Sequence, residues 1–290
     1  MTPKAMLDRL ESVIGISGHP RRLQEAIEIE LCNVSGLPPV QAAEQVEELE
    51  GHVRNLINKR RIERESNGIF PVIVLTSASE RSVAGACWVE SGDSPDMASV
   101  KRRRLQVEPL YREIRSLTFN EFEIFGSKVL KELGASLVHI TPHSEDQGID
   151  FYGVLSLGIF GTSSPPICQL AHDVTIRFAG QAKHYPNSAI GPSMIRELVG
   201  SIMLARYKLF TKETDIFKDL GLLAFNPLLA ILFTTGRFTR GSIELSAKAG
   251  IIARDGEQLS VFLADRGVGV DEDDEKVQFN RDKFRAWLEN

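Results

Sequence analysis

Cysteine is scarce in this chain, and a secretion signal is missing. Of its 290 residues, three are cysteines, Cys32, Cys87 and Cys168, and an odd, scattered set offers no disulfide framework. The opening residues MTPKAMLDRLESVIG do not combine a basic end, an apolar block and a cleavage site, so we expect no signal peptide. Both absences favour a reducing compartment, and we expect a cytoplasmic protein.

Long apolar runs are missing as well. The most apolar stretch, residues 220–233, reads LGLLAFNPLLAILF and is interrupted by Asn226 and Pro227. A membrane-spanning helix needs roughly 20 consecutive apolar residues. We therefore expect no membrane span, and we interpret the second half of the stretch as a buried strand.

An overall excess of positive charge is also absent, because the formal net charge is -5 and the pI is about 5.8. That balance argues against a general polyanion binder. Basic charge is instead concentrated in one run, Lys101, Arg102, Arg103 and Arg104. Such a run is usually a solvated face, and it is also suited to contacting phosphates.

The first part of the chain has the periodicity of helices followed by two strands. Apolar residues at spacings of three and four predict helices at 6–14, 21–34 and 38–63. Two apolar runs joined by a polar turn, at 68–77 and 82–91, predict a strand pair. This order is compatible with a winged-helix module, and equally with any small helical domain that ends in a hairpin.

The pattern changes across a loop-like stretch, SGDSPDMAS, and the basic run that follows it. We therefore expect a recognition or partner module at 1–95 and a basic linker at 96–117. A second domain is expected at 118–266. The acidic run DEDDE then predicts a solvated linker, which leads to a terminal helix within 267–290.

The second domain alternates helices and strands. Its first helix carries an apolar stripe, is capped by Thr118 or Asn120 and ends at Gly134. The elements expected after it are strands at 136–144, 148–160 and 173–185, a helix at 193–210, a strand at 228–235 and a helix at 241–250. Three strands followed by a helical crossover predict an α/β fold, a mixed sheet flanked by helices.

Polar residues on two of these strands have the chemistry of a metal site. Gln181 and Lys183 are two apart on one strand and so share a face, while Asp150 opens the strand before. A carboxylate and an amide oxygen are ligands for a hard cation such as Mg²⁺. A neighbouring lysine stabilises developing charge during attack of water on a phosphodiester. The alternative is an ordinary exposed strand face.

Six short motifs occur in order within residues 119–263. They are Phe122-Glu123 on a helix that ends at Gly134, SEDQGID at 144–150, GQAKHY at 180–185, IRELVGS at 195–201, LFTTGRFT at 232–239 and ARDGEQL at 253–259. Each motif is weak alone. Their order over about 145 residues resembles the Mrr-like restriction endonuclease family, within the PD-(D/E)XK nuclease superfamily.

The resemblance implies a restriction-endonuclease-like sheet and a metal-dependent DNA endonuclease. It implies that Asp150 and Gln181 are metal ligands, with Gln181 where most of the superfamily has an acid, and that Lys183 is the catalytic lysine. Glu123 would be a further acid near the metal, with Glu121 as the alternative because a helix register can slip. The expected cofactor is Mg²⁺, for which Mn²⁺ would substitute.

DNA is the expected partner. Arg196, on the helix after the catalytic strand, and the run from Lys101 to Arg104 are expected to contact phosphates. Cutting both strands calls for two chains, so we expect a homodimer or a subunit of a prokaryotic defence complex. A repair or recombination nuclease, and a catalytically idle DNA-binding subunit, are the alternatives.

Overall fold

The computed structural model describes residues 1–77, 79–141, 148–160, 166, 173–207, 220–221, 226–273 and 276–290. Cys168 and the first four residues of SEDQGID lie outside the described residues. The chain forms two compact units. Unit 1 comprises Met1–Leu110 and Ser260–Phe284, and unit 2 comprises Tyr111–Leu259 and Arg285–Asn290. The division into separable domains that the sequence suggests stays a prediction.

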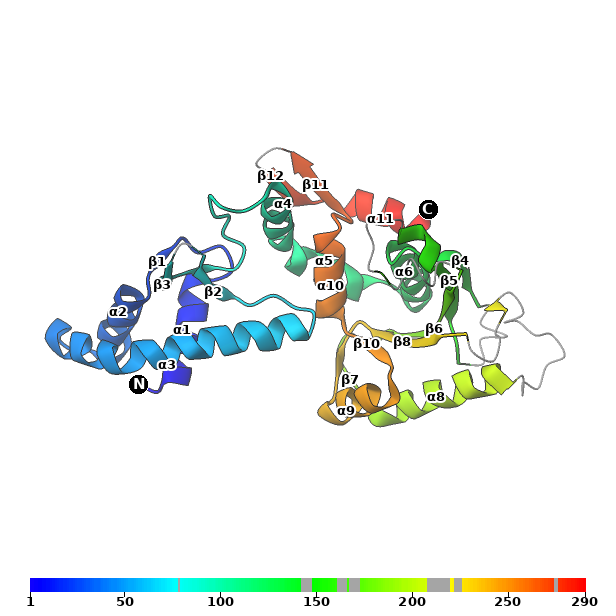
Figure 1. Cartoon of the computed structure of the whole chain (residues 1–290), viewed down its shortest axis with the longest axis horizontal. Coiled ribbons are helices and arrows are strands. Elements are labelled where there is room, and N and C mark those ends of the chain that lie inside the picture. The colour runs from blue at the N-terminus through cyan, green and yellow to red at the C-terminus, as the bar shows by residue number, and fades with distance from the viewer. Residues whose placement is uncertain are drawn as a thin grey trace. The chain divides into compact units, whose positions relative to one another are not determined.

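Unit 1 begins with three helices and a small sheet (Figure 1). In chain order these elements are α1 (Pro3–Ile14), β1 (Arg21–Arg22), α2 (Leu23–Ser35), α3 (Pro39–Ser66), β2 (Ile73–Thr76) and β3 (Ser79–Gly85). The strands pair antiparallel in the order β1-β3-β2. Helix–strand–helix–helix–hairpin with this strand order is the arrangement of a winged-helix module. Its core is formed by buried aliphatic side chains of all three helices, among them Leu7, Ile27 and Val53.

The stretch expected as a loop and a basic linker is helical. Ser94 caps α4 (Pro95–Arg104), accepting a hydrogen bond from the Met97 nitrogen at 3.2 Å, and α5 (Val107–Ser116) follows. The acidic run expected as a solvated linker also differs. Its first residues form β11 (Val270–Asp273), which pairs antiparallel with β12 (Lys276–Phe279). The hairpin is stabilised because Arg103 donates to Glu272 at 2.7 Å, which offsets part of the acidic charge.

Unit 2 is built on a five-stranded mixed sheet, so the fold expected from the sequence is confirmed. Its main elements are α6 (Phe119–Glu132), β4 (Ser136–Ile140), β5 (Phe151–Ser156), β6 (Thr175–Lys183), α8 (Pro192–Tyr207), β8 (Leu228–Thr234), α9 (Arg240–Ala249) and β10 (Ile252–Arg254). The strand order is β10-β8-β6-β5-β4. The first three strands of that order are parallel, and β5 and β4 are antiparallel to their neighbours.

Five further elements lie in unit 2 or cross its boundaries. A 3-10 turn (Leu157–Phe160) ends β5, and β7 (Ala189–Ile190) pairs with β9 (Arg237–Phe238). The helices α10 (Gly256–Asp265) and α11 (Arg281–Glu289) follow. Within the described parts of the chain, no helix combines the length and the apolar character needed to cross a membrane.

The two faces of the large sheet are covered by different helices, α6 on one side and α8 with α9 on the other (Figure 1). On the α6 face, Gly126 and Gly180 lie so close to the Phe151 ring that an added Cβ would be 2.4 and 2.2 Å from it. On the α8 face, Tyr152 and Ala179 join the apolar cluster of that helix. Side chains alternate between the two faces along a strand. This assignment therefore also fixes which face the polar residues at the strand ends point to.

Candidate active site

Asp150 and Gln181 lie opposite each other at the edge of the β5–β6 pairing. The register pairs Phe151 with Gly180, so the next row joins Asp150 to Gln181. Hydrogen bonds hold Asp150 beside Gln181, because its nitrogen donates to the Gly180 carbonyl at 2.9 Å and its carboxylate accepts from the Ala182 nitrogen at 2.7 Å. Side chains opposite each other in an antiparallel pair have Cβ atoms roughly 4.5–5.5 Å apart and point to one face.

Thr141 extends the same row on the other side of Asp150. Ile140 pairs with Phe151, and the Thr141 nitrogen donates to the Asp150 carbonyl at 2.9 Å. The preceding row on this face is His139 with Tyr152, whose rings stack at 5.0 Å. Thr141, Asp150 and Gln181 are therefore neighbours on the face that α8 covers.

The row is buried, and two of its oxygens have no partner among the described residues. Thr141, Asp150 and Gln181 are 3%, 4% and 1% exposed. Asp150 Oδ2 accepts a hydrogen bond from the Ala182 nitrogen at 2.7 Å, which fixes the carboxylate. Among the described residues, nothing donates to Gln181 Oε1 or bonds to Thr141 Oγ1. Buried polar atoms are normally paired, so these two oxygens are candidates for contact with an ion, a water or a substrate group.

Lys183 lies two residues beyond Gln181 on β6, so its side chain is on the same face of the sheet. It pairs with Thr234 across to β8, is half-buried, and forms no ion pair with any described acidic residue. Its carbonyl accepts from the Thr235 nitrogen at 3.3 Å, and the buried Thr235 hydroxyl has no partner in the described part of the chain. The ammonium group is thus available to a substrate that approaches this end of β6.

Gly148 lets α8 approach the backbone that leads into Asp150. Its φ is +83°, a conformation that disfavours a side chain, and a Cβ there would lie 2.3 Å from Ser201 Oγ. The same Cβ position is 3.9 Å from Gln181 Nε2. Ser201, which is 8% exposed, therefore packs directly beside the row.

The two acidic candidates on α6 have different surroundings. Glu121 completes a capping box, because its carboxylate accepts from the Thr118 nitrogen at 2.6 Å, and it also accepts from Arg285 at 2.6 Å. The backbone hydrogen bond from Thr118 lowers the pKa of Glu121, with Arg285 adding to the effect. Glu123 is 4% exposed. The carboxylate of Glu121 is thus held by hydrogen bonds at the start of α6. The role expected of Glu123 stays a prediction.

The basic residues expected to contact phosphates fall in both units. In unit 1, Lys101 donates to Asp93 at 2.7 Å, Arg103 to Glu272 at 2.7 Å and Arg104 to Asp265 at 2.8 and 2.9 Å. Arg102 forms no ion pair with a described residue. Arg196, in unit 2, is exposed on α8. Contact of these side chains with phosphates stays a prediction.

Oxygen atoms are the only donors that the row offers a cation. No group of three or more His, Cys, Asp and Glu side chains suited to a metal occurs among the described residues. The Asp150 carboxylate and the unpartnered Gln181 amide oxygen fit a hard divalent cation that keeps several waters. The residues present therefore fit the expected Mg²⁺.

Unit 2 combines a mixed sheet, helices on both of its faces, and an acid, an amide and a lysine on two neighbouring strands. Residues 114–212 match the Mrr_cat family model of a restriction endonuclease. That match confirms the resemblance for the segment that contains Asp150, Gln181 and Lys183. No curated protein matches the chain.

Two solved structures are similar to parts of the chain. One is the MspJI restriction endonuclease in complex with a 27-mer oligonucleotide, at 20% identity and a TM-score of 0.35 over 61% of this chain. The other is the DNA modification-dependent restriction endonuclease AspBHI, at 16% identity and a TM-score of 0.38 over 74% of this chain. The matches span 35% and 46% of the lengths of those two enzymes.

Three supporting residues are not evident from the sequence. Thr141, Gly148 and Ser201 come from separate segments, and only strand register and helix packing bring them to the row. The one available signal is the position of Gly148 two residues before the candidate ligand Asp150.

Proposed function

We propose that unit 2 is a metal-dependent DNA endonuclease that hydrolyses phosphodiester bonds. The observation that carries the proposal is the Asp150–Gln181 row, in which a fixed carboxylate adjoins a buried amide oxygen with no described partner. The family match at 114–212 supports DNA as the substrate. Restriction or antiviral defence in a prokaryote, as a homodimer or a subunit of a complex, is the setting we propose.

Asp150 and Gln181 would hold the divalent cation, Mg²⁺ or Mn²⁺. When bound, the cation would draw charge from the scissile phosphate and lower the pKa of the attacking water. Asp150 is oriented for this task by the hydrogen bond from Ala182. Gln181 contributes no charge, so the row offers the cation a single carboxylate and should bind it weakly until phosphate oxygens complete the site.

Lys183 would stabilise negative charge that develops on the phosphate. Its position on the same face as Gln181, without an ion pair to a described acid, leaves its charge for the substrate. A preorganised charge of this kind is typically worth a rate factor of 10²–10³. Glu123, buried on α6, is the further acid in the proposal.

Incubation of the pure protein with methylated and unmethylated plasmids, single-stranded DNA and branched DNA tests the proposal. Each DNA is given Mg²⁺, Mn²⁺ or a chelator, and Asp150→Asn is the matched inactive control. We expect cleavage that needs the cation and is lost in the variant. Binding without cleavage of every DNA, by a folded protein with either cation, would instead support the idle DNA-binding subunit.

A further inference from the structure

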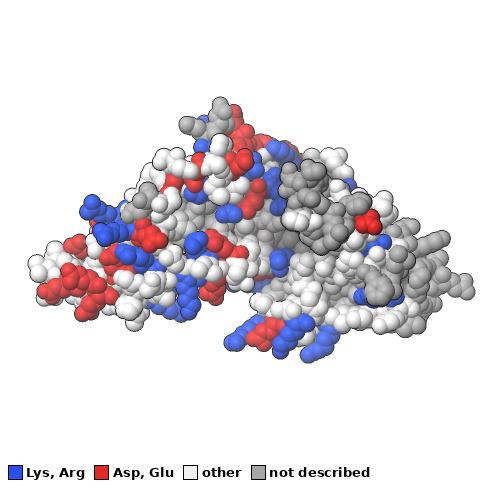
Figure 2. Space-filling view, in the orientation of Figure 1, with Lys and Arg blue, Asp and Glu red and all other residues white. Residues whose placement is uncertain are grey.

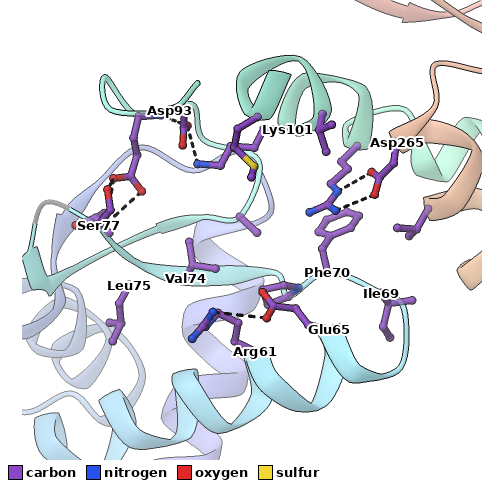
Figure 3. A pocket seen from close by; sticks show the side chains of 18 of the residues that line it. Arg61, Glu65, Ile69, Phe70, Val74, Leu75, Ser77, Asp93, Lys101 and Asp265 are labelled. Carbon is purple, nitrogen blue, oxygen red and sulfur yellow. Dashed lines mark hydrogen bonds and ion pairs between the residues drawn. The ribbon is translucent and has the colours of Figure 1, made fainter. Parts of the chain in front are cut away.

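Unit 1 contains a cavity that the nuclease proposal does not use (Figure 3). Its volume is about 890 Å³, and its walls come from the end of α3, from β2 and from α4. Apolar side chains, among them Phe70, Val74 and Leu75, line it from one side and Met97 and Val100 from another. Cavities of roughly 300–1,000 Å³ with apolar walls and a few polar groups are typical binding sites.

The charged residues that line the cavity are mostly acidic. There are six acidic side chains, Glu65, Glu80, Glu90, Asp93, Asp96 and Asp265, against three basic ones, Arg61, Lys101 and Arg104.

Each of the three basic side chains pairs with an acid of the same walls. Lys101 lies 2.7 Å from Asp93, and Arg61 is near Glu65, as Figure 3 shows. Arg104 pairs with Asp265 at 2.8 Å, and its guanidinium lies 5.3 Å from the Phe70 ring centroid. The uncompensated charge of the lining is therefore negative.

The sign of this charge excludes the DNA backbone as the occupant. A phosphate would be repelled by the exposed Glu80 and Asp96. Each lysine or arginine of the lining would have to break its ion pair before it could bind a phosphate. An occupant with an apolar body and positive charge is instead attracted to both features of the cavity.

The helices of the winged-helix arrangement have the same charge bias. Between Leu23 and Val53, which covers α2 and the first half of α3, the chain has seven glutamates and no lysine or arginine. Figure 2 shows acidic side chains gathered over this end of unit 1. A helix pair that docks on DNA needs basic residues for phosphate contacts, so this face is unsuited to DNA as well.

We propose that the cavity of unit 1 is a docking site for a basic segment of a partner protein, with an apolar anchor between lysine or arginine residues. The anchor occupies the apolar walls beside Phe70 and Leu75, and its flanking cations face Glu80 and Asp96. Unit 1 is then the partner-binding module of the chain, and the cavity itself takes no part in DNA contacts.

Fluorescence anisotropy of the full chain with three labelled peptides tests the proposal. The peptides share a Leu-Phe-Leu core and carry Lys-Arg, Ser-Ser or Glu-Glu on both sides. We expect the basic peptide to bind about tenfold more tightly than the serine peptide, with an affinity that falls as salt rises, and the acidic peptide not to bind. Equal binding of the three peptides, or no binding of any, would overturn the proposal.

Charge reversal at the cavity locates the site. Glu80→Lys combined with Asp96→Lys should weaken the basic peptide about tenfold and admit the acidic peptide. The matched control, Glu47→Lys with Glu48→Lys on the exposed side of α3, carries the same charge change outside the cavity and should leave both affinities nearly unchanged. If the reversed protein does not fold, the neutral pair Glu80→Gln and Asp96→Asn replaces it, with a smaller loss of the basic peptide.

A binding measurement with duplex DNA distinguishes DNA from a basic protein segment as the occupant of the cavity. Both charge-reversed proteins should gain the same small DNA affinity, because only the net charge has changed. A distinctly larger gain for the cavity variant would mean that the cavity faces DNA, and this would contradict the proposal.

Discussion

Asp150 and Gln181 face each other across two neighbouring strands, and among the described residues the Asp150 carboxylate has a hydrogen-bond partner whereas the Gln181 amide oxygen has none. Asp150 Oδ2 accepts from the Ala182 nitrogen at 2.7 Å, whereas Gln181 Oε1 is buried with no partner among the described residues. A buried acceptor left without a hydrogen bond costs roughly 1–3 kcal/mol. A ligand that bonds to this oxygen would remove that cost, which is why we propose a ligand site at this row.

Lys183→Ala should slow cleavage strongly while leaving the fold and DNA binding intact. The ammonium is needed as charge develops on the phosphate, so we expect a loss on the order of 10²–10³ in turnover with little change in stability. Single-turnover cleavage and anisotropy with labelled DNA measure the two effects separately. Full cleavage by the folded variant would contradict the proposed mechanism.

Gln181→Glu should tighten cation binding but lower the stability of the fold when no cation is bound. The new carboxylate lies beside that of Asp150 in a buried row, so the two negative charges repel until a cation neutralises them. Titration calorimetry with Mn²⁺ in the absence of DNA measures the affinity, and thermal unfolding with and without Mn²⁺ measures the stability. Asp150→Asn is the control and should show no cation binding; an unchanged affinity in Gln181→Glu would argue against Gln181 as a ligand.

Local patterns in the sequence predict the helices and main strands of unit 2 because their signals are short-range. The α6 helix has its apolar stripe and its cap, and the structure selects Thr118 over Asn120 because Glu121 completes the capping box. The strand β10 is not predicted, since three residues are too few for a period to show. α4 is missed because the basic run suggests a linker, although Ser94 and Pro95 have the pattern of a helix start.

The candidate site depends more on long-range pairing than the helices do. The sequence places Gln181 and Lys183 on one face, because both lie on one strand. It does not place Thr141 beside Asp150, or Ser201 against Gly148, because register and packing between distant segments decide those contacts. The acidic strand β11 is missed for a different reason: a run of acids suggests a solvated linker, although the strand partner β12 follows directly in the sequence.

Gly148→Ala should destabilise unit 2 by about 1–3 kcal/mol, because a side chain at φ +83° is strained and its Cβ would lie 2.3 Å from Ser201 Oγ. Adding Ser201→Ala should recover part of that loss by removing the hydroxyl. Gly200→Ala is the matched control, since a Cβ there meets nothing within 4 Å and α8 should tolerate it. Urea unfolding measures all three, and a silent Gly148→Ala would contradict the close approach.

Cys87 should make stability depend on pH in the alkaline range. Burial raises the pKa of the Cys87 thiol from 9.0 to about 12, so the folded protein keeps this proton while the unfolded chain loses it. The contribution is complete below the unfolded pKa and is lost as pH rises toward the folded one, by at most about 1.4 kcal/mol per pH unit. Unfolding of wild type and Cys87→Ala across this range should show a steeper loss for wild type. Cys32→Ala is the control, and parallel curves for wild type and Cys87→Ala would contradict the shift.

Thr141→Val should raise stability and lower activity together. Valine has nearly the shape of threonine, so the change removes a buried hydroxyl that has no partner among the described residues, and we expect a gain of about 1 kcal/mol in unfolding free energy. If the hydroxyl holds a water or substrate oxygen beside Asp150, cleavage should fall about tenfold, equal to about 1.4 kcal/mol of transition-state stabilisation. Thr141→Ser keeps the hydroxyl and should retain activity. The half-saturating Mn²⁺ concentration should rise in the valine variant alone, and a variant that is more stable and equally active would show that Thr141 is only a packing residue.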